Sequence, residues 1–202
     1  MKAPPVALPV LVMLIPLAVL AACSRAETPT VNAPAAAPPP AAEPTTSQPV
    51  AEPPTGTAEA KLSGASGSSV QGQLHLTATA GGVTISGEIT GLKPATEHGF
   101  HVHETGDCSA PDAKSAGGHF NPAHVAHGGP TSDVRHLGDI PNIQSDAAGH
   151  VTVSATIPGA TLHDGGADDL VGKAFIVHAK PDDYQTQPSG DSGDRIACGV
   201  IQ

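Results

Sequence analysis

Two histidines lie two positions apart in the stretch GFHVHETGDCSAP, residues 99–111. If this stretch is a β-strand, His101 and His103 point to the same face, because side chains alternate along a strand. Two imidazoles aimed at one point are a typical pair of metal ligands. An alternating strand whose polar face happens to carry two histidines has the same pattern. The pair alone therefore leaves a metal site and a solvated strand face as alternatives.

A second set of candidate ligands lies in HFNPAHVAHGGPTSDVRHLGDIPNI, residues 119–143. Imidazoles recur here eight and nine residues apart, and a carboxylate follows three residues after the last one: His119, His127, His136 and Asp139. Zinc binds imidazole and carboxylate ligands, and copper(II) favours imidazole nitrogens. With the earlier histidine pair and the later His178, the chain has enough ligands for two metals. Two adjacent metal sites are the economical interpretation.

Short β-strands are the elements that must position these residues. The stretch VQGQLHLTATAGGVTISGEITGL has two alternating runs around Gly81 and Gly82, which indicates a hairpin. Similar runs recur in GHVTVSATIPG and VGKAFIVHAK, and no segment has a sustained helical period. Residues 57–202 are therefore expected to form a mainly antiparallel β domain. Two long irregular stretches interrupt it, at 104–144 and 181–194, and loops of that length are typical of functional segments.

The N-terminal part of the chain has a different composition. Residues 1–22 contain an apolar run broken by Pro9 and Pro16 and end in Leu-Ala-Ala before Cys23. This pattern predicts a secretory signal peptide rather than a membrane-spanning helix. Leu-Ala-Ala-Cys resembles the bacterial lipobox, so Cys23 is expected to carry a lipid, with an uncleaved N-terminal anchor as the alternative. Residues 23–56 are rich in Pro, Ala, Thr and Glu and predict a disordered tether.

The charge of the chain bears on its partners, and its cysteine content bears on disulfide formation. A formal net charge of −10 and the lack of a basic patch argue against a nucleic-acid partner. If Cys23 is lipidated, Cys108 and Cys198 remain, and two cysteines in an exported domain are expected to form a disulfide. Such a bond would join the segment after His103 to the last strand. Two free buried thiols are the alternative.

Six stretches, in order, show which family the domain resembles. They are GFHVHETGDC, GGHFNP, HGGP, RHLGDIPNI, FIVHAKPDD and GDRIACGVI, and they lie between residues 99 and 201 of the domain 57–202. The domain resembles a copper,zinc superoxide dismutase. The resemblance implies an all-β fold, an eight-stranded Greek-key antiparallel β-sandwich or barrel with two long functional loops. It also implies an oxidoreductase that converts superoxide to dioxygen and hydrogen peroxide, with copper and zinc as cofactors.

The resemblance further implies a role for each candidate residue. The implied copper ligands are His101, His103, His119 and His178. The implied zinc ligands are His119, His127, His136 and Asp139. His119 would thus bridge the metals, and it and Arg195, which matches the arginine that holds the anion beside copper, are the implied catalytic residues. Asp182 matches a carboxylate that hydrogen-bonds one histidine of each metal. Cys108 and Cys198 match the family's intrasubunit disulfide.

The substrate follows from the resemblance, and the place of action follows from the predicted signal peptide and the lipidated Cys23. Superoxide is an anion and the chain is acidic, and residues 181–202 contain no lysine, so steering is expected to depend mainly on Arg195. The implied location is the bacterial cell envelope, on the periplasmic face and lipid-anchored to a membrane, where the enzyme would protect the envelope from superoxide. Ser24 after Cys23 favours the outer membrane. The resemblance leaves a homodimer open.

Residues outside the ligand set are expected to be structural or solvated. His98 should form a hydrogen bond rather than bind metal, and His124 should lie on the surface of the metal loop. The acidic pair Asp168 and Asp169 predicts a solvated turn. Two other functions remain as alternatives: a non-catalytic copper- or zinc-binding module, and a surface interaction protein that keeps the fold without the chemistry. Missing ligands or a missing Arg195 would favour them, and none of these residues is missing.

Overall fold

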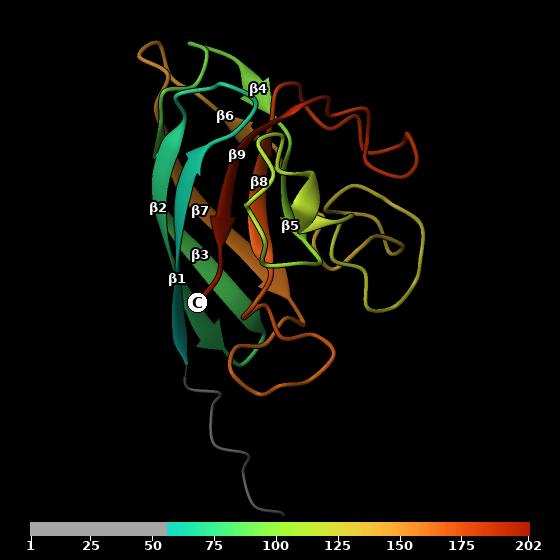
Figure 1. The fold of residues 1–202 in the computed structure, drawn as a ribbon. Coiled ribbons are helices and arrows are strands. Elements are labelled where there is room, and N and C mark those ends of the chain that lie inside the picture. The colour runs from blue at the N-terminus through green and yellow to red at the C-terminus, as the bar shows by residue number, and fades with distance from the viewer. Residues whose placement is uncertain (1–55) are drawn as a thin grey trace, which may run out of the picture. The chain divides into compact units, whose positions relative to one another are not determined.

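The computed structural model describes residues 56–202 and shows an all-β fold (Figure 1). The predicted signal peptide at 1–22, the lipidated Cys23 and the tether up to residue 55 lie outside the described residues. Helical structure in the described part is limited to one 3₁₀ turn, Lys114–Ala116. Residues 56–202 include no helix with the length and apolar character that crossing a membrane requires.

Nine strand segments lie within residues 56–202. Their bounds are β1 Thr57–Gly64, β2 Gln71–Thr79, β3 Gly82–Thr90, β4 Glu97–His98, β5 Phe100–His103, β6 Ile143–Gln144, β7 Val151–Pro158, β8 Ala174–His178 and β9 Arg195–Val200. Seven of them form the main sheet, one fewer than the expected eight strands, and β4 and β6 are two-residue segments that pair only with each other. β6 also shortens the first long loop, which is predicted to extend to residue 144, because Ile143 and Gln144 pair with β4.

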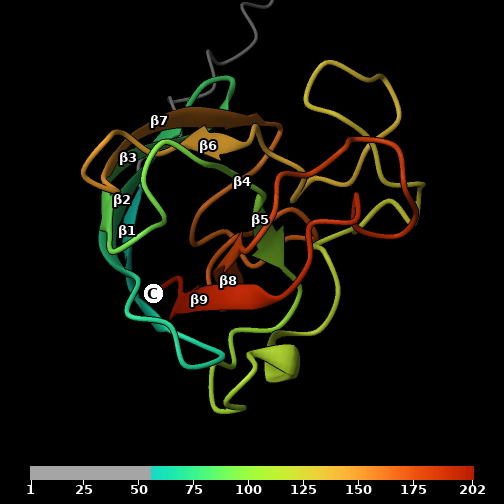
Figure 2. The same cartoon turned by 90° about the horizontal axis from the view of Figure 1, so that it is seen from above.

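Seven strands form one antiparallel sheet in the order β5-β8-β9-β1-β2-β3-β7. The sheet curls so that its β1-β2-β3-β7 half faces its β5-β8-β9 half (Figures 1 and 2). A short pairing joins the two halves, in which Ser63 lies opposite Cys198 and Gly64 opposite Ala197. The chain crosses between the halves from β3 to β5, from β5 to β7 and from β7 to β8. This crossover pattern is the expected Greek-key arrangement.

The predicted hairpin around Gly81 and Gly82 is confirmed. β2 and β3 pair continuously from Gln71 opposite Thr90 to Thr79 opposite Gly82. Gly82 has a φ of 141°, a conformation that favours glycine, and a Cβ atom there would collide with the backbone of the neighbouring strand β7. The other two predicted runs form β7 and β8.

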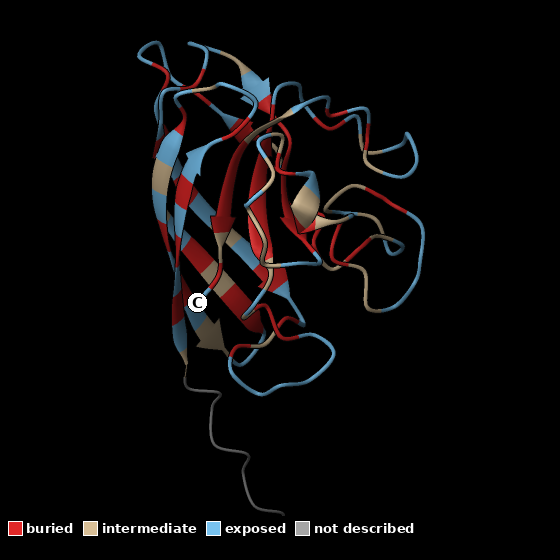
Figure 3. Ribbon diagram, viewed as in Figure 1, coloured by how far each residue is buried: buried red, intermediate tan, exposed pale blue. Residues whose placement is uncertain are grey.

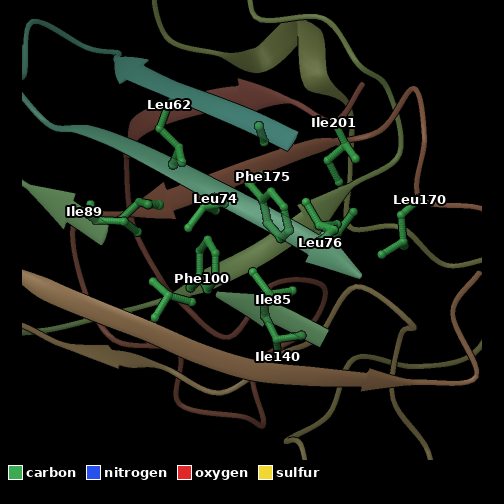
Figure 4. Close-up of a cluster of buried hydrophobic side chains, with 14 of the residues drawn as sticks. Leu62, Leu74, Leu76, Ile85, Ile89, Phe100, Ile140, Leu170, Phe175 and Ile201 are labelled. Atoms are coloured by element: carbon green, nitrogen blue, oxygen red, sulfur yellow. The ribbon is translucent and has the colours of Figure 1, made fainter. Parts of the chain in front are cut away.

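The core lies between the two halves of the sheet. On β1 the residues alternate between buried and exposed, with Ala58, Ala60 and Leu62 facing inward, whereas every residue of β5 and β8 is buried (Figure 3). Large aliphatic and aromatic side chains from both halves meet in the centre (Figure 4). The rings of Phe100 on β5 and Phe175 on β8 stack with their centroids 5.2 Å apart. Burial of each such side chain contributes about 1.5–3 kcal/mol, so this core supports the strand β5 that carries two candidate ligands.

Both long loops project beside β5 and β8, on the same side of the fold (Figures 1 and 2). The first, residues 104–142, contains only the 3₁₀ turn, and the second, 181–194, contains no strand or helix. These loops lie beside the two strands that carry predicted site residues, His101 and His103 on β5 and His178 on β8.

The prediction of a solvated turn at Asp168 and Asp169 is wrong for Asp169. Its side chain is buried and accepts backbone N–H groups of His163, Gly165 and Val171 at 3.1, 2.8 and 2.9 Å. The tight loop leaves these donors without backbone partners, and a short carboxylate can satisfy them locally.

Candidate metal centre

Strand β5 presents its two histidines to the loops and its two apolar residues to the core. Phe100 and Val102 belong to the main hydrophobic cluster. His101 and His103 lie on the opposite face, with ring centroids 6.4 Å apart. The alternation predicted for the FHVH stretch therefore holds in the structure.

The first loop is hydrogen-bonded to the free edge of β5, the edge that does not pair with β8. Val102 donates its N–H to the carbonyl of Gly138 at 3.0 Å and accepts the N–H of Phe120 at 2.8 Å. A Cβ atom on Gly138 would collide with the Val102 carbonyl, so this close approach requires glycine. These contacts bring the neighbouring His119 and Asp139 beside the strand.

The candidate ligands form two groups that share one residue. The first group is His101, His103, His119 and His178, and the second is His119, His127, His136 and Asp139. In each group, one potential ligand atom per residue lies within 4.8 Å of the others. All seven side chains are buried. Residues from 101 to 178 thus meet in one compact cluster, in the two sets that the sequence predicts.

Unpaired nitrogens in the first group fit a metal ion. Nδ1 of His101 and Nε2 of His103, His119 and His178 are buried and have no hydrogen-bond partner among the described residues. On two of the rings the other nitrogen donates to a carbonyl: His103 Nδ1 to Gly117 at 3.0 Å and His178 Nδ1 to Gly193 at 3.2 Å. The unpaired nitrogens of these neutral rings therefore carry lone pairs. Four unprotonated imidazole nitrogens that lie close together are a suitable set of ligands for copper.

The second group is centred on the carboxylate of Asp139. Its Oδ1 lies 2.7 Å from His119 Nδ1 and 3.2 Å from His136 Nδ1. Its Oδ2 accepts the backbone N–H groups of Gly128 and His136, at 3.1 and 2.8 Å. Oδ2 also lies 3.0 Å from His127 Nδ1, without hydrogen-bond geometry. Two lone pairs face each other there, and a cation between them would relieve the repulsion, so imidazole and carboxylate together fit zinc.

Asp182 connects the two groups through the Nε2 atoms of one histidine from each group. Its fully buried carboxylate accepts Nε2–H of His101 at 2.9 Å and Nε2–H of His127 at 3.0 Å. Both bonds leave Nδ1 of the ring free to bind a metal. Gly190 leaves room for this carboxylate, because a Cβ atom at that position would overlap Asp182 Oδ1. One side chain thus sets the tautomer of one histidine in each group.

Burial and crowding favour the neutral form of three histidines of the site, His103, His119 and His178. Burial, together with neighbouring histidines, lowers the pKa of His178 to about 3 and that of His119 to about 4, although the hydrogen bond to Asp139 opposes the shift at His119. The pKa of His103 also lies well below its ordinary value, mainly because of burial. Burial raises the pKa of Asp139, but hydrogen bonds from His119 and His136 outweigh it, and the pKa stays far below its usual range. Neutral imidazoles beside a carboxylate anion are the protonation states that bind metal.

A cavity of about 420 Å³ gives access to the first group. Its lining includes His103, His119, His178 and Arg195, with the exposed Glu104 and His124 among its other residues. Arg195 donates through Nη1 to the carbonyl of Ala113 at 2.8 Å and through Nη2 to that of Gly117 at 2.7 Å. The Gly117 carbonyl is also the partner of His103 Nδ1. The guanidinium is therefore held next to a ligand histidine and faces the cavity.

Two further expectations hold in the structure. Cys108 and Cys198 form the predicted disulfide, with Cα atoms 5.8 Å apart. His98 belongs to neither ligand group, and its Nδ1 donates to the carbonyl of His178 at 2.7 Å. His124 is exposed, as expected, but it also lines the cavity.

Comparison with known proteins agrees with this geometry. The family model for copper/zinc superoxide dismutase (SODC) matches residues 70–201. The chain belongs to the copper/zinc superoxide dismutase family. It is accordingly a dismutase-type oxidoreductase, with copper and zinc as its cofactors.

Individual relatives of this family are similar over most of the domain. Superoxide dismutase [Cu-Zn] 1 of Aquifex aeolicus is 44% identical over 134 residues, which cover 65% of this chain and 79% of the relative. Superoxide dismutase [Cu-Zn] 2 of the same organism is 44% identical over 136 residues, 66% of this chain and 80% of the relative. The crystal structure of a SOD-like protein from Bacillus subtilis superposes with a TM-score of 0.64 at 37% identity, over 71% of this chain and 97% of that one.

Some residues at this dismutase site had no signal in the sequence. Asn142 and Gln187 hydrogen-bond the backbones of Asp182 and His127. Their partners are 40 and 60 positions away, and an isolated Asn or Gln in a loop has no pattern that predicts such a contact. Glu104, which lines the cavity, directly follows the HxH pair, and that adjacency was its only signal.

Proposed function

We propose that the chain disproportionates superoxide at a copper ion held by the first ligand group, with zinc in the second group and His119 shared by both metals. The observation that carries this proposal is the position of His119. Its Nδ1 lies 2.7 Å from Asp139 in the second group, and its Nε2, on the other side of the ring, is buried without a partner among residues 56–202. An imidazole with one nitrogen for each group is what a bridging ligand needs.

The two metals supply different chemistry. Bound copper supplies a centre that accepts and then returns one electron, whereas zinc has no redox chemistry and orders the loop. The overall reaction converts two superoxide anions and two protons to dioxygen and hydrogen peroxide. The protein must therefore deliver protons as well as bind the anion.

His119 is the residue that we assign to proton delivery. Its Nε2, which would hold copper, is the nitrogen that would take up a proton, while Nδ1 stays on the side of Asp139. Nε2 then gives the proton to the reduced oxygen species, and solvent in the cavity supplies the second proton. His119 lines the cavity, which supports direct transfer to a substrate bound there.

Arg195 is the residue that we assign to anion binding. Its guanidinium lines the cavity beside His103 and is oriented by two carbonyl groups. Because the chain is acidic and residues 181–202 contain no lysine, this local charge must attract superoxide against the overall field.

We also propose that this reaction takes place in the bacterial cell envelope. The proposal rests on the sequence of residues 1–22 as a signal peptide, Cys23 as a lipid-modified residue and 23–56 as a tether that holds the domain 57–202 near a membrane. Labelled fatty acid should be incorporated into the wild-type protein and not into a Cys23→Ser variant. The periplasmic face, with the outer membrane favoured by Ser24, would place the enzyme where envelope superoxide arises.

One preparation tests the proposed chemistry. The protein is loaded with copper and zinc, and metal content, the copper(II) spectrum and superoxide consumption are measured together. We expect one ion of each metal per chain and rapid dismutation. His119→Ala should lose dismutation and weaken both sites, whereas His124→Ala, which changes a histidine outside both groups, should keep both metals. Two bound metals without dismutation would instead support a metal-binding module.

A further inference from the structure

Two carboxamide side chains link the two long loops in opposite directions. Asn142, at the end of the first loop, donates Nδ2–H to the carbonyl of Asp182 and accepts the Asp182 N–H at Oδ1, both at 2.9 Å. Gln187, in the second loop, donates Nε2–H to the carbonyl of His127 and accepts the His127 N–H at Oε1, again both at 2.9 Å. We call these contacts the carboxamide pairs. Each loop thus binds the backbone of one residue of the other.

The two residues held in this way are themselves hydrogen-bonded. His127 Nε2 lies 3.0 Å from Asp182 Oδ1. Asn142, Asp182, His127 and Gln187 therefore form a continuous chain of hydrogen bonds that crosses between the loops three times. Asp182 also orients His101, so the chain reaches both ligand groups.

The geometry suits carboxamides and no other side chains of this size. Each amide meets the backbone N–H and the backbone carbonyl of one residue, and its own acceptor and donor match them in a single orientation. Asp or Glu at either position would keep the acceptor but place an oxygen against a backbone carbonyl. The pairs therefore specify Asn and Gln by chemistry rather than by volume.

We propose that Asn142 and Gln187 are positioning residues that hold His127 and Asp182 in the metal-binding arrangement before a metal is present. Preorganised ligands lower the cost of ordering the loops when a metal binds. The proposal rests on the proposed role of His127 as a zinc ligand. It adds that the second loop contributes to zinc affinity through Gln187, which holds the backbone of His127.

Two single substitutions and their combination test the carboxamide pairs. For Asn142→Ala and Gln187→Ala, we expect zinc affinity to fall by about tenfold each, as for other partners that orient ligands. The double variant should lose less than the product of the two effects, because both pairs support one His127–Asp182 contact. Asn142→Asp and Gln187→Glu should be no better than the alanine variants. Zinc affinity is measured by chelator competition on the full chain.

A spectrum and an exchange measurement separate positioning from general stability. Cobalt(II) bound in place of zinc should show shifted ligand-field bands in the two alanine variants, because the geometry of His127 changes. In the metal-free protein, the amide hydrogens of His127 and Asp182 should be protected from exchange and should lose that protection in the variants. The matched control is Ser145→Ala, which removes a buried hydroxyl that links Thr96 and Lys93 away from the ligands. It should lower stability and leave the cobalt spectrum unchanged.

The outcomes distinguish this proposal from the proposed function. If wild-type protein binds zinc and the carboxamide variants match it in affinity and cobalt spectrum, the positioning role is wrong while the metal site stands. If wild-type protein binds no zinc, the metal assignment is wrong, and amide exchange in the metal-free protein still decides whether the pairs order the loops. Unprotected His127 and Asp182 amides in the wild-type protein would overturn the proposal in either case.

Discussion

The carboxylate of Asp182 accepts Nε2–H of His101 at 2.9 Å, and both side chains are completely buried. The other oxygen of the same carboxylate binds His127 in the second group. A single buried anion therefore fixes the orientation of one imidazole for each metal, and a change at this position should affect both sites together.

Replacing Asp182 by Asn should weaken both metals. The variant keeps the shape but loses the charge, and its NH₂ group must face one of the two ring N–H donors. We expect copper and zinc affinity each to fall by about 10- to 100-fold. Chelator competition measures both. Asp183→Asn is the control, because Asp183 is exposed and its carboxylate bonds only within its own turn, to Gln185 and Thr186. Equal affinities in Asp182→Asn and wild type would contradict the role of this carboxylate.

Arg195→Ala should slow the capture of superoxide. With the main local cation of the cavity gone, we expect kcat/KM to fall by about tenfold at low salt and to depend less on ionic strength. The measurement is the rate of superoxide decay over a series of salt concentrations. Lys180→Gln is a suitable control, since Lys180 is exposed and pairs with Asp191 at 3.5 Å. An unchanged salt-dependent rate in Arg195→Ala would show that steering lies elsewhere.

Loss of the disulfide should destabilise the fold. The Cys108–Cys198 bond closes a loop of 90 residues, for which the chain-entropy model gives about 4 to 5 kcal/mol. The double substitution Cys108→Ser and Cys198→Ser should lower the free energy of unfolding by roughly that amount. Denaturant unfolding measures this change in the free energy of unfolding. The metal-free protein is used because metal binding would mask the effect. A change below about 1 kcal/mol would mean that the bond constrains little in the unfolded chain.

The metal-free protein should become less stable as the pH falls below about 6.5. The pKa of His119 is about 4 in the fold because of burial, while an unfolded histidine titrates near 6.5. Between these values the unfolded chain binds more protons than the folded one, so stability decreases with decreasing pH. His119 alone accounts for about 3 kcal/mol, and His178, with a pKa of about 3, extends the loss to lower pH. A free energy of unfolding that stays constant from about pH 7 to 4.5 would contradict the lowered pKa values of these buried histidines.

The sequence predicts the ligand set and most strands because both leave local patterns. The alternation in β2 and β3, the glycine pair between them and the HxH spacing on β5 each depend on neighbouring residues alone. The family motifs then add the expected partners, and in the structure the same seven side chains form the two groups.

Long-range hydrogen bonds account for what the sequence does not reveal. Asn142 and Gln187 reach backbones 40 and 60 positions away, and no spacing or composition records that contact. Acidic residues usually lie in solvent, which is the reason for expecting Asp169 there. In the structure its carboxylate instead turns inward and accepts three backbone N–H groups of a tight loop. β4 and β6 are too short for a periodic signal.

The shared imidazole of His119 is the central claim, and electron paramagnetic resonance tests it most directly. The protein is loaded with copper(II) in the first group and cobalt(II) in the second. An imidazolate bonded to both ions couples their unpaired electrons, so the copper(II) signal seen with copper alone should disappear or broaden strongly when cobalt is added. Copper and cobalt spectra that simply add would contradict a ligand shared by the two metals.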